Sequence, residues 1–261
     1  MSNVAVVTGA GHGLGKKIAE RLATRGLHVV VTDIDGDAAR ATASAIGGEA
    51  VTQDVRDPDS HRAVARLAAE RGRVTVWVNN AGVLLVGTAW ELPDDIPRRM
   101  IEINLLGVIW GSSAAIGVMV DGGHILNMGS LSSLVPAPGL AAYGASKHGV
   151  LGYSLSLAGE LRRAGKRIRV SALCPDAMAG EMTDRVAHDT AAAGILFSAG
   201  TMLTLDAAAD AAIDLLDHPR LVKVLPAYRA ALIHLLRPFP GIGLPLLEQF
   251  AKLGRRRLAR R

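Results

Sequence analysis

Two residues with complementary proton chemistry stand four positions apart in the chain. Tyr143 and Lys147 belong to the segment Tyr-Gly-Ala-Ser-Lys, and this spacing places both side chains on one face of a helix. An ammonium group beside a phenol favours the phenolate and lowers the phenol pKa from about 10 toward the range useful for general acid–base catalysis. A lone pair of this kind is more often an ordinary pair on a helix surface, so its meaning depends on the residues around it.

Other polar residues come directly after predicted strands. Asn80 belongs to Asn-Asn-Ala-Gly at the end of the fourth predicted strand, and Ser130 follows the fifth. Ser132 and Ser133 are the alternatives to Ser130, but they are better explained as polar loop residues. Ser130 is therefore the candidate reactive hydroxyl.

A glycine-rich loop follows the first predicted strand and opens the first helix. It reads Thr-Gly-Ala-Gly-His-Gly-Leu-Gly over residues 8–15. Glycines at such a place permit a tight turn, close approach of the backbone to a pyrophosphate, and dense packing of helix on strand. The loop predicts a dinucleotide site, and the alternative is a glycine-rich turn without a ligand.

Asp33 closes the second predicted strand, 18 residues after Gly15. A carboxylate there accepts hydrogen bonds from the adenosine ribose hydroxyls and repels a 2′-phosphate, which favours NAD over NADP. His12 in the loop argues the other way when it is protonated. We give Asp33 more weight because a carboxylate is charged at pH 7, whereas the charge of His12 is conditional. The alternative for Asp33 is a solvated acid at a strand end.

Short β-rich runs alternate with stretches of helical composition, as in a parallel sheet whose strands are joined by helical crossovers. The pattern predicts an α/β fold with a doubly wound parallel sheet of about seven strands. The predicted strands are 4–8, 28–32, 50–53, 74–78, 124–128, 168–173 and 221–225, and the predicted helices are 14–25, 37–46, 59–71, 94–119 and 143–163.

Together with Asn80, Ser130 and Asn104, the glycine loop and the Tyr-x-x-x-Lys pair make the chain resemble the short-chain dehydrogenase/reductase family, in its single-domain branch of roughly 250 residues. The resemblance runs from about Asn3 to Leu225, and it implies a Rossmann-type fold with helices on both faces of the sheet. The family places its serine 13 residues before the tyrosine, as Ser130 stands before Tyr143.

The resemblance implies a role for each matching residue. Tyr143 would transfer the hydroxyl proton, Ser130 would bind the substrate oxygen, and Lys147 would hold the nicotinamide ribose and lower the pKa of Tyr143. Asn104 would support a water that links Lys147 to solvent. The implied cofactor-binding residues are Gly9, His12, Gly13, Leu14, Gly15, Asp33, Asp54, Val55, Asn80, Ala81, Gly82, Tyr143, Lys147 and Pro175.

Two departures from the family pattern stand near the carboxyl end of the sixth predicted strand. The family commonly has Pro-Gly there and a threonine four positions later, where the nicotinamide carboxamide is held. Here Asp176 follows Pro175, and Gly180 stands at the threonine position, which leaves Thr183 as a displaced candidate. The carboxamide contact is therefore open.

The implied reaction is the interconversion of a secondary alcohol and a ketone by hydride transfer to or from NAD(P). A lid-like insertion is predicted at 183–205, and residues 191–205 are uncharged. Its apolar side chains predict an apolar substrate such as a lipid, terpenoid or steroid, unless they only complete the core. The rival function is a catalytically silent dinucleotide sensor or scaffold on the same fold. The apolar residues are Ile195, Leu196, Phe197, Met202 and Leu203.

The basic character of the chain is confined to its end. The whole chain carries +5 and residues 237–261 carry +6, which leaves −1 for residues 1–236. We predict that 1–236 form the dehydrogenase domain and that 237–261 form a basic amphipathic appendage. It either packs on the body or a neighbouring subunit, which we favour, or makes peripheral contact with an anionic membrane surface. Nucleic-acid binding is not predicted, because the tail lacks an aromatic platform or a groove-reading motif.

Composition narrows the remaining possibilities. Hydrophobic residues make up 49% and charged residues 20% of the 261 residues, which excludes disordered and fibrous classes. The single cysteine, Cys174, favours a reducing compartment, and the start lacks a secretion signal, so we expect a cytoplasmic protein, peripheral at most to a membrane. The uncharged run 103–120 is expected to be a buried core helix rather than a membrane span. No metal site is predicted, and a homodimer or homotetramer is expected.

Overall fold

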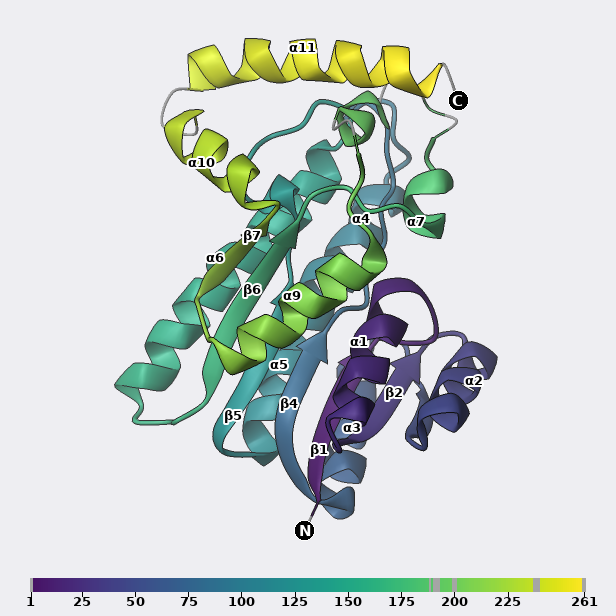
Figure 1. Cartoon of the computed structure of the whole chain (residues 1–261), viewed down its shortest axis with the longest axis vertical. Helices are drawn as coiled ribbons and strands as arrows, with labels where there is room; N and C mark the ends of the chain where they lie inside the picture. Colours follow the sequence, from purple (N-terminus) through teal and green to yellow (C-terminus); the bar gives the residue numbers. More distant parts are fainter. Residues whose placement is uncertain (1, 188, 190–192, 199–200, 237–239, 260–261) are drawn as a thin grey trace.

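Runs of valine and other apolar residues form seven parallel strands in the order β3-β2-β1-β4-β5-β6-β7. The computed structural model describes residues 2–187, 189, 193–198, 201–236 and 240–259. The order reverses between β1 and β4, where sequential crossovers change direction (Figure 1). The strands are β1 (Asn3–Thr8), β2 (His28–Asp33), β3 (Glu49–Thr52), β4 (Arg73–Asn79), β5 (Met119–Met128), β6 (Arg169–Pro175) and β7 (Val222–Leu225).

Helices cover both faces of the sheet because alternate strand residues are apolar on both sides. Side chains of α1, α2 and α9 pack with Ala5 and Val7 on one face, whereas those of α3, α5 and α6 pack with Val4 and Val6 on the other. The predicted Rossmann-type doubly wound fold is therefore confirmed. The helices are α1 (Gly13–Thr24), α2 (Gly36–Ile46), α3 (Pro58–Arg71), α5 (Gly107–Val118), α6 (Ala141–Arg163) and α9 (Leu205–Asp217).

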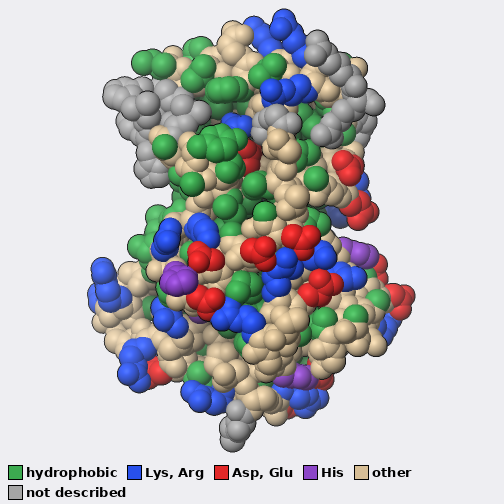
Figure 2. Space-filling view, in the orientation of Figure 1, with side chains coloured by type: hydrophobic (Ala, Val, Ile, Leu, Met, Phe, Trp, Pro, Cys, Tyr) green, Lys and Arg blue, Asp and Glu red, His purple; other side chains and the backbone are tan. Residues whose placement is uncertain are grey.

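The α1 and α9 helices lie side by side and are joined by ion pairs. The Arg21 guanidinium lies 2.8 Å from the Asp206 carboxylate and 2.6 Å from that of Asp210. Figure 2 shows the charged side chains of this region as a band across the middle of the molecule. The α9 helix has no counterpart among the predicted helices, although its buried alanines pack directly on the sheet.

The predicted helix 94–119 is interrupted. It divides into α4 (Asp95–Ile101), a π-helical turn η1 (Glu102–Leu106) and α5. A π-helical turn widens the helix locally and often occurs at functional sites. The segment Asp95–Val118 is long and apolar enough to span a membrane by length and composition. It is less buried than the expected core helix, because only 33% of its most apolar window is buried. One face of α5 packs on β4 and α3, and the other stays near the surface.

The C-terminal helices cross the carboxyl end of the sheet. In Figure 1, α10 (Ala227–Leu236) rises from β7, and α11 (Pro240–Leu258) lies across the top of the molecule. The α11 helix packs on η3 (Gly194–Phe197), a short 3-10 helix within the predicted lid. Residues 188, 190–192, 199–200, 237–239 and 260–261 of the predicted lid and tail lie outside the described residues.

The predicted lid is joined near its end to the segment that follows β6. Met178 and Leu203 form a parallel β-bridge, and the Ala179 N–H donates to the Leu203 carbonyl oxygen over 2.9 Å. These bonds tie the end of the predicted lid to the segment after β6. Between them lies α7 (Glu181–Asp184).

Candidate active site

Lys147 lies on α6, one turn after Tyr143, and is almost fully buried at 5% exposure. Its Nζ donates to the Met128 carbonyl oxygen at the end of β5 over 2.8 Å and lies 5.9 Å from the centre of the Tyr143 ring. Burial lowers the pKa of Lys147 to about 8. The ammonium form is therefore stable at neutral pH and lost in mild alkali.

The phenol of Tyr143 differs from the sequence expectation. Burial raises the pKa of Tyr143 above its usual value, and a hydrogen bond with the Ser130 side chain lowers the pKa by a smaller amount. The predicted lowering of the Tyr143 pKa by Lys147 is therefore wrong for this structure, because removing the phenolate from water outweighs the hydrogen bond with Ser130. Tyr143 is a neutral proton donor at pH 7.

Ser130 is positioned by the short helix that follows it. Ser130 is the N-cap of η2 (Leu131–Ser133): its Oγ accepts from the Ser132 N–H over 3.1 Å, and its own N–H donates to Ser133 Oγ over 3.1 Å. Ser132 and Ser133 are buried, whereas Ser130 is partly exposed. The three-serine segment thus presents one hydroxyl beside Tyr143.

Asn104 lies in the π-helical turn and is fully buried. Its Oδ1 accepts from the Val83 N–H over 2.8 Å, and its Nδ2 donates to the Val83 carbonyl oxygen over 2.9 Å and to Ser146 Oγ over 3.1 Å. Asn104 therefore fixes the segment after β4 against α6. A Cβ built on Gly82 would lie 3.2 Å from Asn104 Oδ1 and 3.6 Å from Lys147 Nζ, so Gly82 lies beside both side chains.

Asn80 ties the end of β4 to the glycine loop. Its Nδ2 donates to the carbonyl oxygens of Thr8 and Gly9, each over 2.9 Å, and the Ala81 N–H donates to Thr8 Oγ1 over 3.1 Å. Gly9 has a φ of 62°, and a Cβ there would lie 2.7 Å from the Ala81 Cα. Glycine is thus required for both its conformation and its space.

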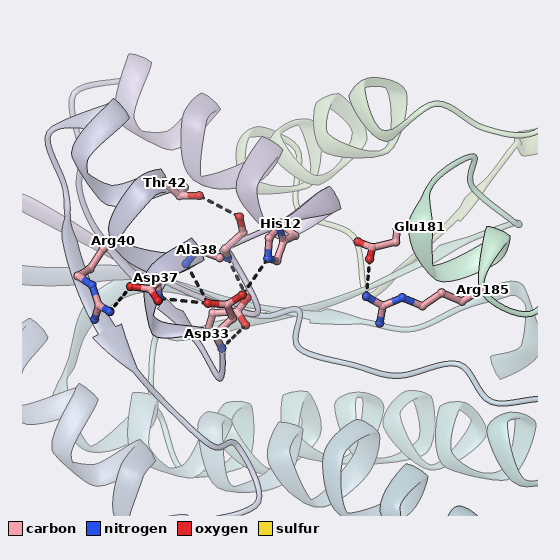
Figure 3. Close-up of polar contacts among 10 residues, drawn as sticks. His12, Asp33, Asp37, Ala38, Arg40, Thr42, Glu181 and Arg185 are labelled. Atoms are coloured by element: carbon pink, nitrogen blue, oxygen red, sulfur yellow. Dashed lines mark hydrogen bonds and ion pairs between the residues drawn. The ribbon is translucent and has the colours of Figure 1, made fainter.

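Asp33 holds the glycine loop from the end of β2 (Figure 3). Its Oδ2 accepts from the Gly11 N–H over 2.9 Å, and its Oδ1 accepts from the Asp35 N–H over 3.1 Å. Thr42 of α2 donates from Oγ1 to the Gly11 carbonyl oxygen over 3.1 Å. The carboxylate is partly exposed beside the loop, as a ribose ligand must be.

His12 precedes α1 and turns toward a second acid. Its Nε2 lies 3.5 Å from Asp35 Oδ2, and both side chains are exposed. Hydrogen bonds from the Ala38 backbone and from His12 lower the pKa of Asp35. The cation that would have argued for NADP is therefore matched by a nearby carboxylate.

The first turn of α1 fits an anionic ligand. The α2 and α3 helices are capped by the side chains of Asp35 and Asp57 and carry an acid in their first turns. The α1 helix has neither a capping side chain nor an acid there. Its first N–H groups and the positive end of its dipole are therefore available, and residues 9–15 with Asp33 fit a dinucleotide.

Asp54 and Val55 follow β3, as predicted for the adenine side. A hydrogen-bonded ion pair with Arg56 (2.6 Å) lowers the pKa of Asp54, and the Val55 carbonyl oxygen lies 3.0 Å from His61 Nε2. Beside them is a shallow cavity of about 310 Å³ on the α3 and η1 side. It is lined by Asp54, Arg56, Asp57, Glu102, Leu106 and Trp110.

Asp176 and Arg229 form a pair that the sequence analysis missed. Pro175 ends β6, and Asp176 Oδ2 lies 3.1 Å from Arg229 Nε of α10, with 14% and 12% of the two side chains exposed. Asp176 drew notice as a departure from Pro-Gly, but nothing in the chain marked Arg229 as its partner. The displaced candidate Thr183 is buried, and its Oγ1 donates to the Met178 carbonyl oxygen over 2.6 Å.

The apolar lid residues belong partly to a small core. Phe197 is 3% exposed and packs with Val186 and Ala193, while Leu84 and Val86 after β4 lie against this cluster. Leu196 and Met202 are only partly buried there. Arg185 of this region pairs with Glu181, as Figure 3 shows.

The sheet order, the free helix terminus at the glycine loop and the grouping of Ser130, Tyr143 and Lys147 define a dinucleotide-binding protein of the oxidoreductase type. The family model described as short chain dehydrogenase matches residues 3–191. The chain belongs to the short-chain dehydrogenase/reductase family, as the sequence motifs predicted.

Individual relatives support the same assignment. The chain is 38% identical over 185 residues to 1-deoxy-11-beta-hydroxypentalenate dehydrogenase of Streptomyces exfoliatus, covering 67% of this chain and 66% of the relative. It is 36% identical over 198 residues to 3-oxoacyl-[acyl-carrier-protein] reductase FabG of Escherichia coli K12, covering 74% and 80%. The chain thus spans just under two thirds of the first of these relatives.

A solved structure is similar over nearly the whole chain. A short chain dehydrogenase/reductase from Burkholderia phymatum, in complex with NAD, superposes with a TM-score of 0.84 and 28% identity. The match covers 93% of this chain and 95% of that one.

Proposed function

We propose that the protein interconverts a secondary alcohol and a ketone by hydride transfer with a nicotinamide dinucleotide. The observation that carries this proposal is the grouping of Ser130, Tyr143 and Lys147, in which the Tyr143 phenol is hydrogen-bonded to Ser130 and lies on the same helix face as a buried lysine. A sensor or scaffold has no use for such a proton-transfer group. Family membership and the NAD-bound structural relative support the same reaction.

Each residue of the site has a separate role in the proposed reaction. The Ser130 hydroxyl binds the substrate oxygen, and the neutral Tyr143 phenol donates a proton to that oxygen when a ketone is reduced. In alcohol oxidation the phenol must first lose its proton, which burial opposes. Lys147, still an ammonium at pH 7, would hold the nicotinamide ribose one turn away from Tyr143, and Asn104 holds the segment after β4 around it. A bound nicotinamide supplies or accepts the hydride.

We propose NAD rather than NADP as the cofactor. Gly9, Gly13 and Gly15 would hold the pyrophosphate against α1, and Asp33 would accept hydrogen bonds from the adenosine ribose. A 2′-phosphate would meet the carboxylates of Asp33 and Asp35 at this end. Arg40, the nearest arginine in Figure 3, is already paired with Asp37 over 2.5 Å.

We propose an apolar substrate. The supporting observation is the position of Leu84 and Val86, which follow Gly82. They pack against the same small buried cluster around Phe197 as the partly buried Leu196 and Met202 of the lid. These side chains put an apolar wall next to the segment that Asn104 holds. Such a wall favours a hydroxylated or keto lipid, terpenoid or steroid over an acid.

We also propose a homodimer or homotetramer assembled through α5. Its outer face carries apolar side chains that remain partly exposed, among them Ile109 and Trp110. A helix this apolar is normally covered on both sides in solution. Light scattering of the wild type and Trp110→Glu checks this: the variant should shift toward the monomer.

The decisive assay pairs two substrates on one carbon skeleton. One is an apolar secondary alcohol, and the other carries an added carboxylate; each is tested with NAD and with NADP. We expect turnover of the apolar member with NAD. NADH binding, followed by fluorescence, without turnover of any alcohol or ketone would favour the sensor instead.

A further inference from the structure

The buried Asp176–Arg229 pair joins three parts of the chain that are distant in sequence. Asp176 begins the segment that leads from β6 to α7, and Arg229 belongs to α10. The Arg229 guanidinium lies 5.9 Å from the Tyr228 ring and 6.0 Å from the ring of Phe250 in α11. The pair therefore connects the end of β6 to both C-terminal helices.

The two facing atoms of the Asp176–Arg229 pair have no other polar partner among the described residues. Asp176 Oδ2 and Arg229 Nε are inaccessible to solvent, and neither atom makes a hydrogen bond to a described residue. Burial raises the pKa of Asp176, and Arg229 opposes that rise. An ion pair buried in this way fixes position, because removing one partner leaves an uncompensated charge. No ligand can reach these two atoms, so their contact serves to hold position.

The other oxygen of Asp176 shapes the backbone beside it. Oδ1 accepts from the Ala177 N–H over 2.9 Å, and the Asp176 N–H donates to the Leu225 carbonyl oxygen at the end of β7 over 2.8 Å. The Leu203 N–H donates to the Ala177 carbonyl oxygen over 3.1 Å. The carboxylate thus holds Ala177 with one oxygen and α10 with the other, at the base of the lid.

We propose that Asp176 and Arg229 are positioning residues that set the backbone of 176–180 for the nicotinamide half of the cofactor, so that α10 and α11 are working parts of the site. This inference rests on the proposed function and on the family resemblance, which implies that the nicotinamide carboxamide is held by the segment after β6. It also gives an explanation for one departure from the family pattern, the acid in place of glycine.

The test separates the two halves of the cofactor. Asp176→Asn keeps the shape of the side chain and its acceptor for Ala177 but removes the charge. Dissociation constants are measured for NADH and for ADP-ribose, which lacks the nicotinamide. We expect Asp176→Asn to weaken NADH on the order of tenfold and to leave ADP-ribose within about twofold. Amide hydrogen exchange of residues 177–180, measured without nucleotide, should accelerate.

A second pair of variants tests the charge coupling. Arg229→Met leaves the carboxylate unpaired and should weaken NADH more than Asp176→Asn does. Adding Asp176→Asn to Arg229→Met should restore part of the NADH affinity. Arg167→Met, which breaks the exposed pair with Asp121, is the matched control and should change nothing.

Equal losses for NADH and ADP-ribose, or no loss for either, would overturn the proposal, since both mark a general structural role or none. If the wild type binds neither nucleotide, the proposed function fails. In that case amide hydrogen exchange of residues 177–180 still tests whether the Asp176–Arg229 pair holds this backbone. Unchanged exchange in Asp176→Asn would show that it does not.

Discussion

At the adenosine end of the proposed cofactor site, Gly9, Gly11 and Asp33 are held by contacts within the first 81 residues. The reacting end draws on segments from the whole chain: Ser130 after β5, Tyr143 on α6, and Asp176 joined to Arg229 of α10. The first end is a local motif with backbone donors, and the second is assembled by tertiary packing. Changes at the first should therefore alter which nucleotide binds, and changes at the second should alter what the bound nucleotide does.

The largest effect is expected at the reacting end. Tyr143→Phe removes the proton donor and should lower kcat by about 10²–10⁴-fold, with the dissociation constant of NADH changed only a few-fold. Tyr153→Phe on the same helix, whose hydroxyl lies 3.4 Å from the Ile109 carbonyl oxygen, is the matched control. Retention of more than about a tenth of the activity would remove Tyr143 from its role.

A smaller effect is expected at the adenosine end, where a substitution should change cofactor preference. Asp33→Arg replaces the ribose acceptor with a partner for phosphate, so the ratio of kcat/KM for NAD over NADP should fall on the order of 10–100-fold. The same charge change at the exposed Asp59 of α3 should leave the ratio unaltered. Wild-type protein that uses both cofactors equally would contradict the assignment of Asp33 and point to His12.

The two directions of reaction should respond differently to pH. Because burial raises the pKa of Tyr143, the phenol is protonated at neutral pH, and the fraction of phenolate grows about tenfold per pH unit. Between about pH 6 and 7, below the lowered pKa of Lys147 (about 8), alcohol oxidation should therefore rise with pH and ketone reduction should stay nearly flat. An oxidation profile that levels off below pH 8 would show that the pKa of Tyr143 is lowered, as its spacing from Lys147 predicted.

The smallest effect concerns the end of α11. Deleting Gly254–Arg261 removes the close packing of Gly254 on Gly194 and the hydrogen bond from Arg257 to the Ser198 carbonyl oxygen, but keeps Phe250. We expect Tm to fall by about 2–6 °C, or the oligomeric state to change, with turnover of a soluble ketone retained.

The same deletion tests membrane contact. Lys252, Arg256, Ile242 and Leu253 are exposed on α11, and Figure 2 shows apolar side chains at this end of the molecule. The buried face of the helix, with Gly243, Ala251 and Gly254, packs inward, which favours the packing role. Salt-sensitive sedimentation of the intact protein with anionic vesicles, lost on deletion, would show that the tail is a membrane contact.

The sequence by itself determined the parts that depend on local stereochemistry. The glycines of residues 9–15, the acid at the end of β2 and the four-residue spacing of Tyr143 and Lys147 are each dictated by backbone geometry within one turn or one strand end. Alternating β-rich and helical segments then predicted the seven-stranded sheet, because buried parallel strands need apolar runs and crossovers of a set length.

Only the tertiary structure decided the rest. The interruption at Glu102–Leu106, the neutral Tyr143 phenol and the Asp176–Arg229 pair depend on which groups lose contact with water when distant segments pack together. Desolvation acts through space and leaves no trace in spacing, so a lysine four residues away predicted the wrong direction for the pKa of Tyr143. For the same reason Asp176 stood out in the sequence only as an irregularity, until α10 brought Arg229 beside it.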